Sequence, residues 1–179
     1  METFWASGYD ATSVPMLTEA MGISAQSLYA AFGSKDALYR EAIALYQSTV
    51  GGFGARAMAE EDDAIAAMAR LFRDAASAFT SSPTHPGCMI TAAPSGQSDD
   101  PLTIFGRQLR AEAMRQVKGR LERGKREGQL RADTDCDAWA RYVVGVTQGL
   151  STQALDGETL KGLLTTAEIA ARVLEELRR

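Results

Sequence analysis

His85 and Cys88 are three positions apart in the segment His-Pro-Gly-Cys, a spacing that suits a thiolate–imidazole pair or half of a metal site. His85 is the only histidine and Cys136 the only other cysteine, so no third group orients a catalytic base and no usual zinc set is complete. We therefore expect no catalytic residue, no metal and no cofactor, and predict that the chain is not an enzyme. Burial in a core is the plain expectation for Cys88. Ligand contact or redox sensing stays open, because a cysteine near a helix start can have a lowered pKa.

Two glycine-containing segments have the spacing of nucleotide-binding loops. Residues 52–57 match the loose dinucleotide pattern G-x-G-x-x-A, but that pattern needs a preceding strand and a βαβ unit, and neither is predicted. Gly33, Ser34 and Lys35 are similar to the end of a phosphate-binding loop, yet Leu28 stands where that loop requires glycine. Neither segment predicts a nucleotide site.

The elements that must position any site belong to a soluble globular chain. Its 179 residues are 45% hydrophobic and 23% charged, which is close to the average of such proteins and sufficient for a sizeable core. No apolar run approaches the ~18 residues of a membrane span, and the N-terminus lacks a signal-peptide pattern. Together with two cysteines, these features predict the reducing cytoplasm. The net charge of −4 argues against non-specific nucleic-acid binding by the whole chain.

The spacing of apolar residues predicts helices almost throughout and no strand of useful length. One stripe is formed by Ile65, Met68, Phe72, Ala76 and Phe79, and a longer one by Leu102, Phe105, Leu109, Ala113, Val117 and Leu121. Four of the five prolines fall between positions 81 and 101, where a loop is expected. The fold class is therefore all-α. A soft boundary near residue 48 divides the chain into two domains, residues 1–48 and residues 49–179.

Residues 4–39 contain a helix-turn-helix pattern. Gly8 ends one helix, Thr12 or Ser13 caps the next, and that helix stops at Gly22. Ser24 then caps a second short helix only two residues later, which is the spacing of this motif. The outward residues of the second helix are small or hydrogen-bonding, as the DNA major groove requires: Ala25, Gln26, Ser27, Tyr29 and Ala30. Gln26 can read an adenine edge, and we expect phosphate contacts from Thr12, Ser24, Tyr29 and Lys35.

At this level of detail the chain resembles the tetracycline-repressor (TetR) family of bacterial transcriptional regulators. The resemblance is carried by an ordered, ungapped set: Phe4, Gly8, Tyr9, Thr12, Val14, Leu17, Gly22, Ile23, Ser24, Leu28, Tyr29, Phe32, Lys35 and Leu38. Residues 85–90, 123–135 and 147–157 are similar to the larger half of one branch of that family. The resemblance implies a homodimer that binds double-stranded operator DNA and releases it when a small molecule occupies the larger domain.

Two features depart from the family pattern. Only the last turn or two of the usual first helix is present, from Glu2 to Ser7, so we expect that residues preceding this chain complete it. Residues 1–48 also hold two cations, Lys35 and Arg40, against five carboxylates, which gives a net charge of −3. Since phosphate contacts supply much of DNA affinity, this domain is expected to bind weakly and with a shallow salt dependence.

The larger domain is expected to hold a mainly apolar effector between its helices. Aromatic and methionine side chains at helical spacing, together with Cys88, are the predicted ligand contacts: Phe72, Cys88, Met89, Phe105, Trp139 and Tyr142. Thr147, Gln148 and Tyr142 are the candidate polar groups. Taken singly, each of these residues is more often part of a plain core, but together they can line a cavity. The many cations of the segment from Arg107 to Arg126 flank an apolar stripe, which predicts a solvated helix face rather than a second nucleic-acid surface.

Two C-terminal helices carry more apolar residues than one short core needs. The predicted dimer interface consists of Val143, Val146, Leu150, Leu160, Leu164, Ala167 and Ala171, and small residues such as Gly145 and Gly149 allow close helix approach. Two such helix pairs related by a twofold axis form a four-helix bundle, and the operator is then palindromic. The alternative is that these stripes face only their own domain.

The favoured function is therefore a ligand-responsive transcriptional repressor. A ligand-binding dimer without DNA-binding activity is the main alternative, because the head is acidic and its first helix is short. A small helical enzyme is the third class, for which the inventory of nucleophiles and bases is poor. DNA binding at low salt distinguishes the repressor from the ligand-binding dimer. The enzyme hypothesis would need a catalytic turnover that is lost when His85 or Cys88 is changed.

Overall fold

The computed structural model describes all residues from 1 to 179 and is built from helices joined by short turns and one long loop. In chain order the helices are α1 (Glu2–Ala11), α2 (Val14–Met21), α3 (Ala25–Phe32), α4 (Lys35–Ser48), η1 (Val50–Gly52), α5 (Phe53–Glu60), α6 (Ala64–Phe79), α7 (Pro101–Arg126), α8 (Cys136–Leu155), α9 (Leu160–Leu174) and η2 (Glu175–Leu177). The prediction of an all-α fold is confirmed. No helix has both the length and the apolar character that crossing a membrane requires.

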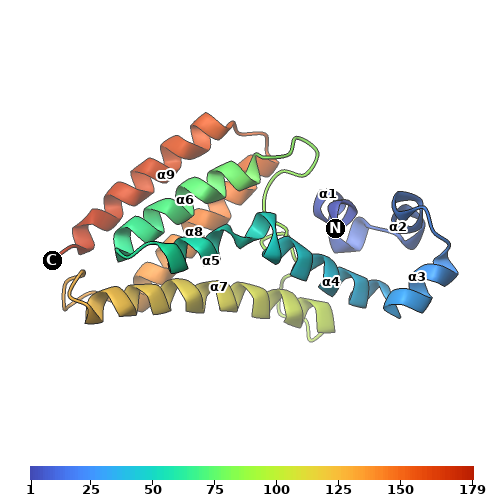
Figure 1. The fold of residues 1–179 in the computed structure, drawn as a ribbon, viewed down its shortest axis with the longest axis horizontal. Helices are drawn as coiled ribbons and strands as arrows, with labels where there is room; N and C mark the ends of the chain where they lie inside the picture. The colour runs from blue at the N-terminus through green and yellow to red at the C-terminus, as the bar shows by residue number, and fades with distance from the viewer.

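Figure 1 shows two regions that lie side by side. We call α1–α4 the head (residues 1–48) and the rest of the chain the body (residues 49–179). In the body, α6 packs against α5, α8 and α9, and α7 runs beneath them and packs against α8. The loop of residues 80–100 crosses between the body helices and the head.

Local sequence signals set the helix limits. The hydroxyl of Ser34 accepts a hydrogen bond from the backbone N–H of Ala37 at 3.0 Å, which caps α4 as expected. Asp63 and Asp100 cap α6 and α7 in the same way, through bonds of 2.8 Å to Ala66 and Thr103. Three prolines, Pro83, Pro86 and Pro94, leave the 80–100 segment without a regular helix, so residues 88–93 form only a tight turn there.

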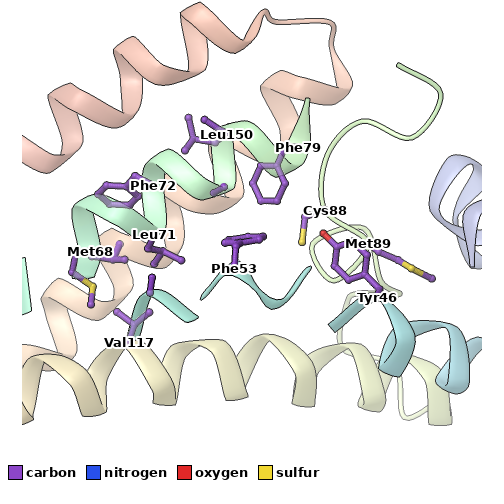
Figure 2. Close-up of a cluster of buried hydrophobic side chains, with 14 of the residues drawn as sticks. Tyr46, Phe53, Met68, Leu71, Phe72, Phe79, Cys88, Met89, Val117 and Leu150 are labelled. Carbon is purple, nitrogen blue, oxygen red and sulfur yellow. The ribbon is translucent and has the colours of Figure 1, made fainter. Parts of the chain in front are cut away.

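The core is continuous from the head to the body. The stripe predicted on α6 is entirely buried, since Ile65, Met68, Phe72, Ala76 and Phe79 are at most 1% exposed. Figure 2 shows part of this cluster, in which Phe53, Phe79 and Leu71 face one another below α6. Tyr46 from α4 and Met89 from the loop extend the cluster toward the head.

Candidate functional site

The head contains two short helices, α2 and α3, held at a sharp turn by three local devices. Ser13 caps α2 by accepting a bond from the Met16 N–H at 3.3 Å. Gly22 ends α2 in the left-handed conformation, with φ 65° and ψ 30°, which few other residues adopt. Ser24 then caps α3 by accepting from the Ser27 N–H at 3.1 Å. Buried Leu17 and Leu28 complete the packing, and this geometry is the predicted helix-turn-helix.

The outward side of α3 is open to solvent. The exposed residues are Ala25, Gln26, Ser27, Tyr29, Ala30 and Ala31. Tyr29 is 48% exposed although its side chain is large and partly apolar. Gln26 carries both a donor and an acceptor, and its neighbours are small enough for close approach of another backbone. This surface can enter a groove about 12 Å wide and form hydrogen bonds with its floor and walls.

The predicted phosphate contact at Thr12 is wrong. Thr12 is 0% exposed, and its hydroxyl donates to the carbonyl of Gly8 at 2.6 Å. Gly8 has φ 72° and breaks α1, so the threonine ties the two halves of the kinked helix together rather than reaching outward. The close spacing of a glycine and a threonine in residues 8–12 was the signal for this internal role.

The two cations of the head are both engaged within the protein. The Lys35 ammonium lies 4.1 Å from the centre of the Tyr9 ring, at the start of α4. The Tyr9 hydroxyl donates to Asp36. Burial is the largest cause of the raised pKa of Tyr9, and this bond is the next largest. The Arg40 guanidinium packs 4.2 Å from the Phe105 ring of α7 and donates to the carbonyl of Pro101 at 3.3 Å. Arg40 is therefore turned toward the body, and Lys35 remains the cation next to α3.

A cavity of about 170 Å³ lies beneath α6, lined by residues of the body and by Gln47 of α4 in the head. Its apolar wall includes Phe53, Met58, Leu71, Phe79, Cys88, Ile90, Leu109, Val117 and Val144. Its polar wall includes Gln47, Thr91, Arg110, Gln116, Thr147 and Gln148. The cavity therefore offers a mainly apolar space with amide and hydroxyl groups and two charged side chains, Arg110 and Glu112, in its lining, a mixture typical of small-molecule sites.

Most of the predicted ligand contacts do not line this cavity. Phe72 and Met89 are 0% and 2% exposed and pack in the core, whereas Phe105 packs against Arg40 and Tyr39 at the junction with the head. Trp139 and Tyr142 stack edge to face at 5.5 Å, and Tyr142 donates to a carbonyl of α9 at 3.5 Å.

Cys88 is the one residue of the predicted ligand set in the cavity wall; of the proposed polar groups, Thr147 and Gln148 also line it. Sequence reasoning missed Phe53 and Gln47, which belong to the segment around the interruption at Gly51, Gly52 and Gly54. The glycines there were the available signal, because an interruption between two helices can leave a space that no helix fills.

Part of the predicted dimer interface is internal to one subunit. Val143, Leu150 and Ala167 are 0%, 0% and 1% exposed, so they cannot contact a second copy without unpacking α8 and α9. The remaining predicted residues are accessible: Val146, Leu164 and Ala171 are half-buried and Leu160 is 43% exposed. Three further apolar side chains are exposed on these helices, namely Leu155, Ile169 and Val173. Each of them is adjacent in the sequence to a residue of the buried stripe, and the spacing of apolar residues alone does not distinguish the exposed positions from the buried ones.

The basic helix α7 is only partly solvated. Arg120 is 4% exposed, and one of its terminal nitrogens donates to the carbonyls of Glu61 and Asp62 at 3.1 and 2.7 Å. Burial lowers the pKa of Arg120. Arg110 is half-buried and donates to the loop carbonyl of Ala93 at 3.0 Å. These two arginines hold the α5–α6 turn and the long loop onto α7, which corrects the expectation of a uniformly solvated face.

The chain is similar to known regulators along almost its whole length. A model of the family described as "Bacterial regulatory proteins, tetR family" matches residues 1–42. The HTH-type transcriptional repressor ComR of Escherichia coli (strain K12) is 30% identical over 182 residues, which cover 99% of this chain and 86% of that protein. The HTH-type transcriptional repressor BdcR of the same strain is 24% identical over 174 residues, covering 97% and 84%.

A solved structure agrees with this assignment. A cysteine mutant of the TetR family transcriptional regulator CifR, complexed with 26-base-pair double-strand operator DNA, superposes with a TM-score of 0.89. The two chains are 37% identical, and the match covers 96% of this chain and 91% of that one. The exposed α3 on a capped helix-turn-helix, the helical body behind it and these matches lead to one conclusion: the chain belongs to the tetR family of bacterial regulatory proteins.

Proposed function

We propose that this protein is a transcriptional repressor that binds a palindromic operator as a homodimer and leaves it when a small, mainly apolar molecule occupies the body cavity. The observation that carries the proposal is the open face of α3, with Gln26 and Tyr29 exposed on a helix that Ser24 and Gly22 fix in place. The fold match to CifR in complex with operator DNA supports it. On this proposal, residues 1–48 bind DNA and residues 49–179 bind the effector and the second subunit.

In this proposal α3 lies in the major groove. Gln26 forms a bidentate bond with an adenine, and Ala25 permits close approach of the helix to the bases. Ser24, Ser27, Tyr29 and Lys35 hold phosphates and so fix the position of α3 without reading sequence. The hydroxyls of Ser24 and Ser27 are hydrogen-bonded to each other at 3.0 Å, so the one that accepts keeps its own O–H free to donate to a phosphate oxygen.

The second subunit covers the exposed apolar side of α8 and α9. Ile169 and Val173, one turn apart on α9, are 52% and 36% exposed and form an apolar strip that a second copy can cover. Adding a Cβ at Gly145 or Gly149 would meet no other atom within 4 Å, so both glycines leave room for a neighbouring helix. A twofold axis through this face would place two copies of α3 for a palindromic site.

The cavity sets the class of effector. A volume of 170 Å³ compares with the roughly 150 Å³ of an engineered apolar cavity that holds benzene, so the effector is a single-ring or short-chain molecule unless the walls open. Gln116 and Gln148 at the edge suit one hydrogen-bonding group on that molecule. The effector weakens DNA binding only to the extent that it binds more tightly to the protein conformation that does not bind DNA than to the one that does. A tenfold loss of operator affinity requires about 1.4 kcal/mol of such preference.

The first test is a salt-titrated binding measurement with DNA flanking the protein's own gene and excess competitor DNA. Specific binding to one palindromic segment is expected, and Gln26→Ala should weaken it by roughly 5- to 150-fold per half-site, since a good bidentate base contact is worth about 1–3 kcal/mol. Gln108→Ala, an exposed glutamine on α7 outside the head and the proposed interface, is the matched control and should leave binding unchanged. No specific binding at any salt concentration would favour a ligand-binding dimer without DNA-binding activity.

The dimer and the effector are tested separately. Sedimentation equilibrium should give a dimer that Ile169→Glu dissociates, whereas Ala111→Glu, at an exposed position of α7, should not. A screen of small aromatic and aliphatic compounds for thermal stabilisation should find ligands that Val144→Phe, which fills part of the cavity, no longer accepts. A monomer, or stabilisation that survives Val144→Phe, would contradict the respective part of the proposal.

A further inference from the structure

One peptide group joins the head to the body through hydrogen bonds on both of its edges. The indole N–H of Trp5, in α1, donates to the carbonyl of Gly87 at 3.2 Å in a buried position. The N–H of Cys88 donates to the hydroxyl of Ser151, in α8, at 2.9 Å and is also buried. The carbonyl of Gly87 and the N–H of Cys88 belong to the same planar peptide group, so neither can rotate without the other. A single rigid unit therefore connects α1 with α8.

The surroundings of this Gly87–Cys88 peptide leave it little freedom. The N–H of Gly87 donates to the carbonyl of Phe79 at 2.9 Å, at the end of α6. Gly87 has φ +77°, and a Cβ there would lie 2.8 Å from Leu155 Cγ and 3.0 Å from the carbonyl oxygen of Ser151. Both the backbone conformation and the close approach to α8 thus require glycine. A displacement of α8 at Ser151 would therefore carry this peptide with it.

The peptide also borders the cavity. Cys88 lines the cavity wall, and so do Thr147 and Gln148, which precede Ser151 by about one turn of α8. Figure 2 shows Cys88 between Phe79 and Tyr46, with the tyrosine hydroxyl turned toward it. That hydroxyl is buried and forms no hydrogen bond of normal geometry, although Cys88 and the Met89 backbone lie close to it, and a buried hydroxyl without a well-aligned partner costs free energy. A movement of Cys88 would therefore change its contact with the Tyr46 hydroxyl, whose hydrogen bonding is incomplete.

On the head side, Trp5 is embedded in the packing of α1 and α4. Its ring meets the Tyr46 ring edge-on at 5.0 Å and lies 5.7 Å from the ring of His85. The neighbouring Phe4 meets Tyr39 of α4 edge-on at 5.1 Å. Helix α3 packs on α4, so a shift of Trp5 changes the support of the helix that carries the exposed face.

We propose that the Gly87–Cys88 peptide transmits occupancy of the body cavity to the head, with Trp5 as the receiving residue and Ser151 as the anchor on α8. This inference rests on the proposed repressor function, because it concerns how the same cavity controls α3. A molecule that presses on Cys88 or on the Thr147 turn shifts the peptide plane, and the indole of Trp5 follows the carbonyl to which it is bonded.

The test uses an occupant built into the chain, so that no effector need be known. Cys88→Met extends the side chain into the cavity and is expected to weaken operator binding about tenfold, within the usual range of coupling between sites. In the Trp5→Phe background, which keeps an aromatic ring and removes the N–H, the same substitution should weaken binding less than twofold. Cys136→Met, at the other buried cysteine, is the matched control and should have no effect in either background.

Equal weakening by Cys88→Met with and without the Trp5 indole would overturn the proposal, and so would a folded Cys88→Met protein with unchanged operator affinity. A second arm needs no DNA and covers the case in which Cys88→Met does not fold. In a Trp139→Phe background Trp5 is the only tryptophan, and Ser151→Ala should make its fluorescence more accessible to acrylamide. Unchanged quenching would overturn the proposal. Absence of specific DNA binding by the unaltered protein, by contrast, bears on the repressor function and leaves this second arm decisive.

Discussion

The salt dependence of operator binding follows directly from the positions of the two cations in the head. Each phosphate neutralised by a lysine or arginine contributes about −0.9 to the slope of log affinity against log salt concentration. Arg40 is exposed, but its guanidinium packs on Phe105 and donates to the Pro101 carbonyl, so we assign it no phosphate contact. Lys35 is then the single cationic contact per subunit, and a dimer neutralises two phosphates through side-chain charges.

The expected slope is therefore about −1.8, and operator affinity should fall only about twelvefold between 50 and 200 mM salt. A protein with six to ten cationic phosphate contacts loses roughly a thousandfold or more over the same range. The assay is fluorescence anisotropy of labelled operator DNA at several salt concentrations. Lys35→Met should bring the slope close to zero, because it removes both charged contacts of the dimer.

Tyr29→Phe is the matched control for the slope. It removes a neutral hydroxyl from the same face of α3, so affinity should fall while the slope stays at the value of the unaltered protein. A slope steeper than about −4 would refute the reasoning, because it would require charged contacts that the head does not supply. An unchanged slope in Lys35→Met would refute the assignment of Lys35.

Three further predictions concern the elements that hold the site. Ser24→Ala should lower the free energy of unfolding by about 1 kcal/mol in chemical denaturation, because it removes the helix cap. Ser24→Asp should keep the cap and still weaken operator binding, because its charge repels the phosphates. Loss of binding without any loss of stability in Ser24→Ala would contradict the capping role. Gly106→Ala should destabilise the protein by about 1–3 kcal/mol, because the new Cβ would collide with a carbonyl oxygen of the preceding loop. Gly119→Ala, in the same helix, places its Cβ near no other atom and should stabilise the protein by about 0.5–1 kcal/mol. Equal effects of the two substitutions would exclude the steric explanation. Burial alone would raise the pKa of Asp63, but the bonds from Arg178 and from the α6 N-terminus outweigh it and leave the pKa lowered. This carboxylate therefore stabilises the fold above its unfolded pKa and loses that effect as the pH falls through its folded pKa. Asp63→Asn should destabilise by less than about 1 kcal/mol at pH 7 and by progressively less as the pH is lowered, and a difference that stayed constant in acid would exclude the ion pair as its cause.

The sequence predicted best those parts of the fold that local chemistry decides. Ser24 and Ser34 cap helices, and Gly22 stops one, because each acts within three or four residues of its own position. Thr12 had the residue type of a phosphate ligand, and only the kink at Gly8 shows that its hydroxyl is used internally. Arg120 had the composition of a surface cation, yet it is buried by the α5–α6 turn, which comes from a segment nearly sixty residues away. Contacts of that range are not encoded in spacing.

Helix α8 shows why the cavity and the interface resisted prediction. Val143 faces the core, Val144 lines the cavity, and Val146 lies partly exposed beside α9, so three similar residues within one turn serve three different surfaces. A helix that is apolar on most sides gives no periodic signal that could divide these roles. Since Ser151 on the same helix holds the Gly87–Cys88 peptide, substitutions along α8 should alter dimerisation, effector binding and DNA affinity together. Only paired variants, measured in each assay, can assign an effect on α8 to one of these surfaces.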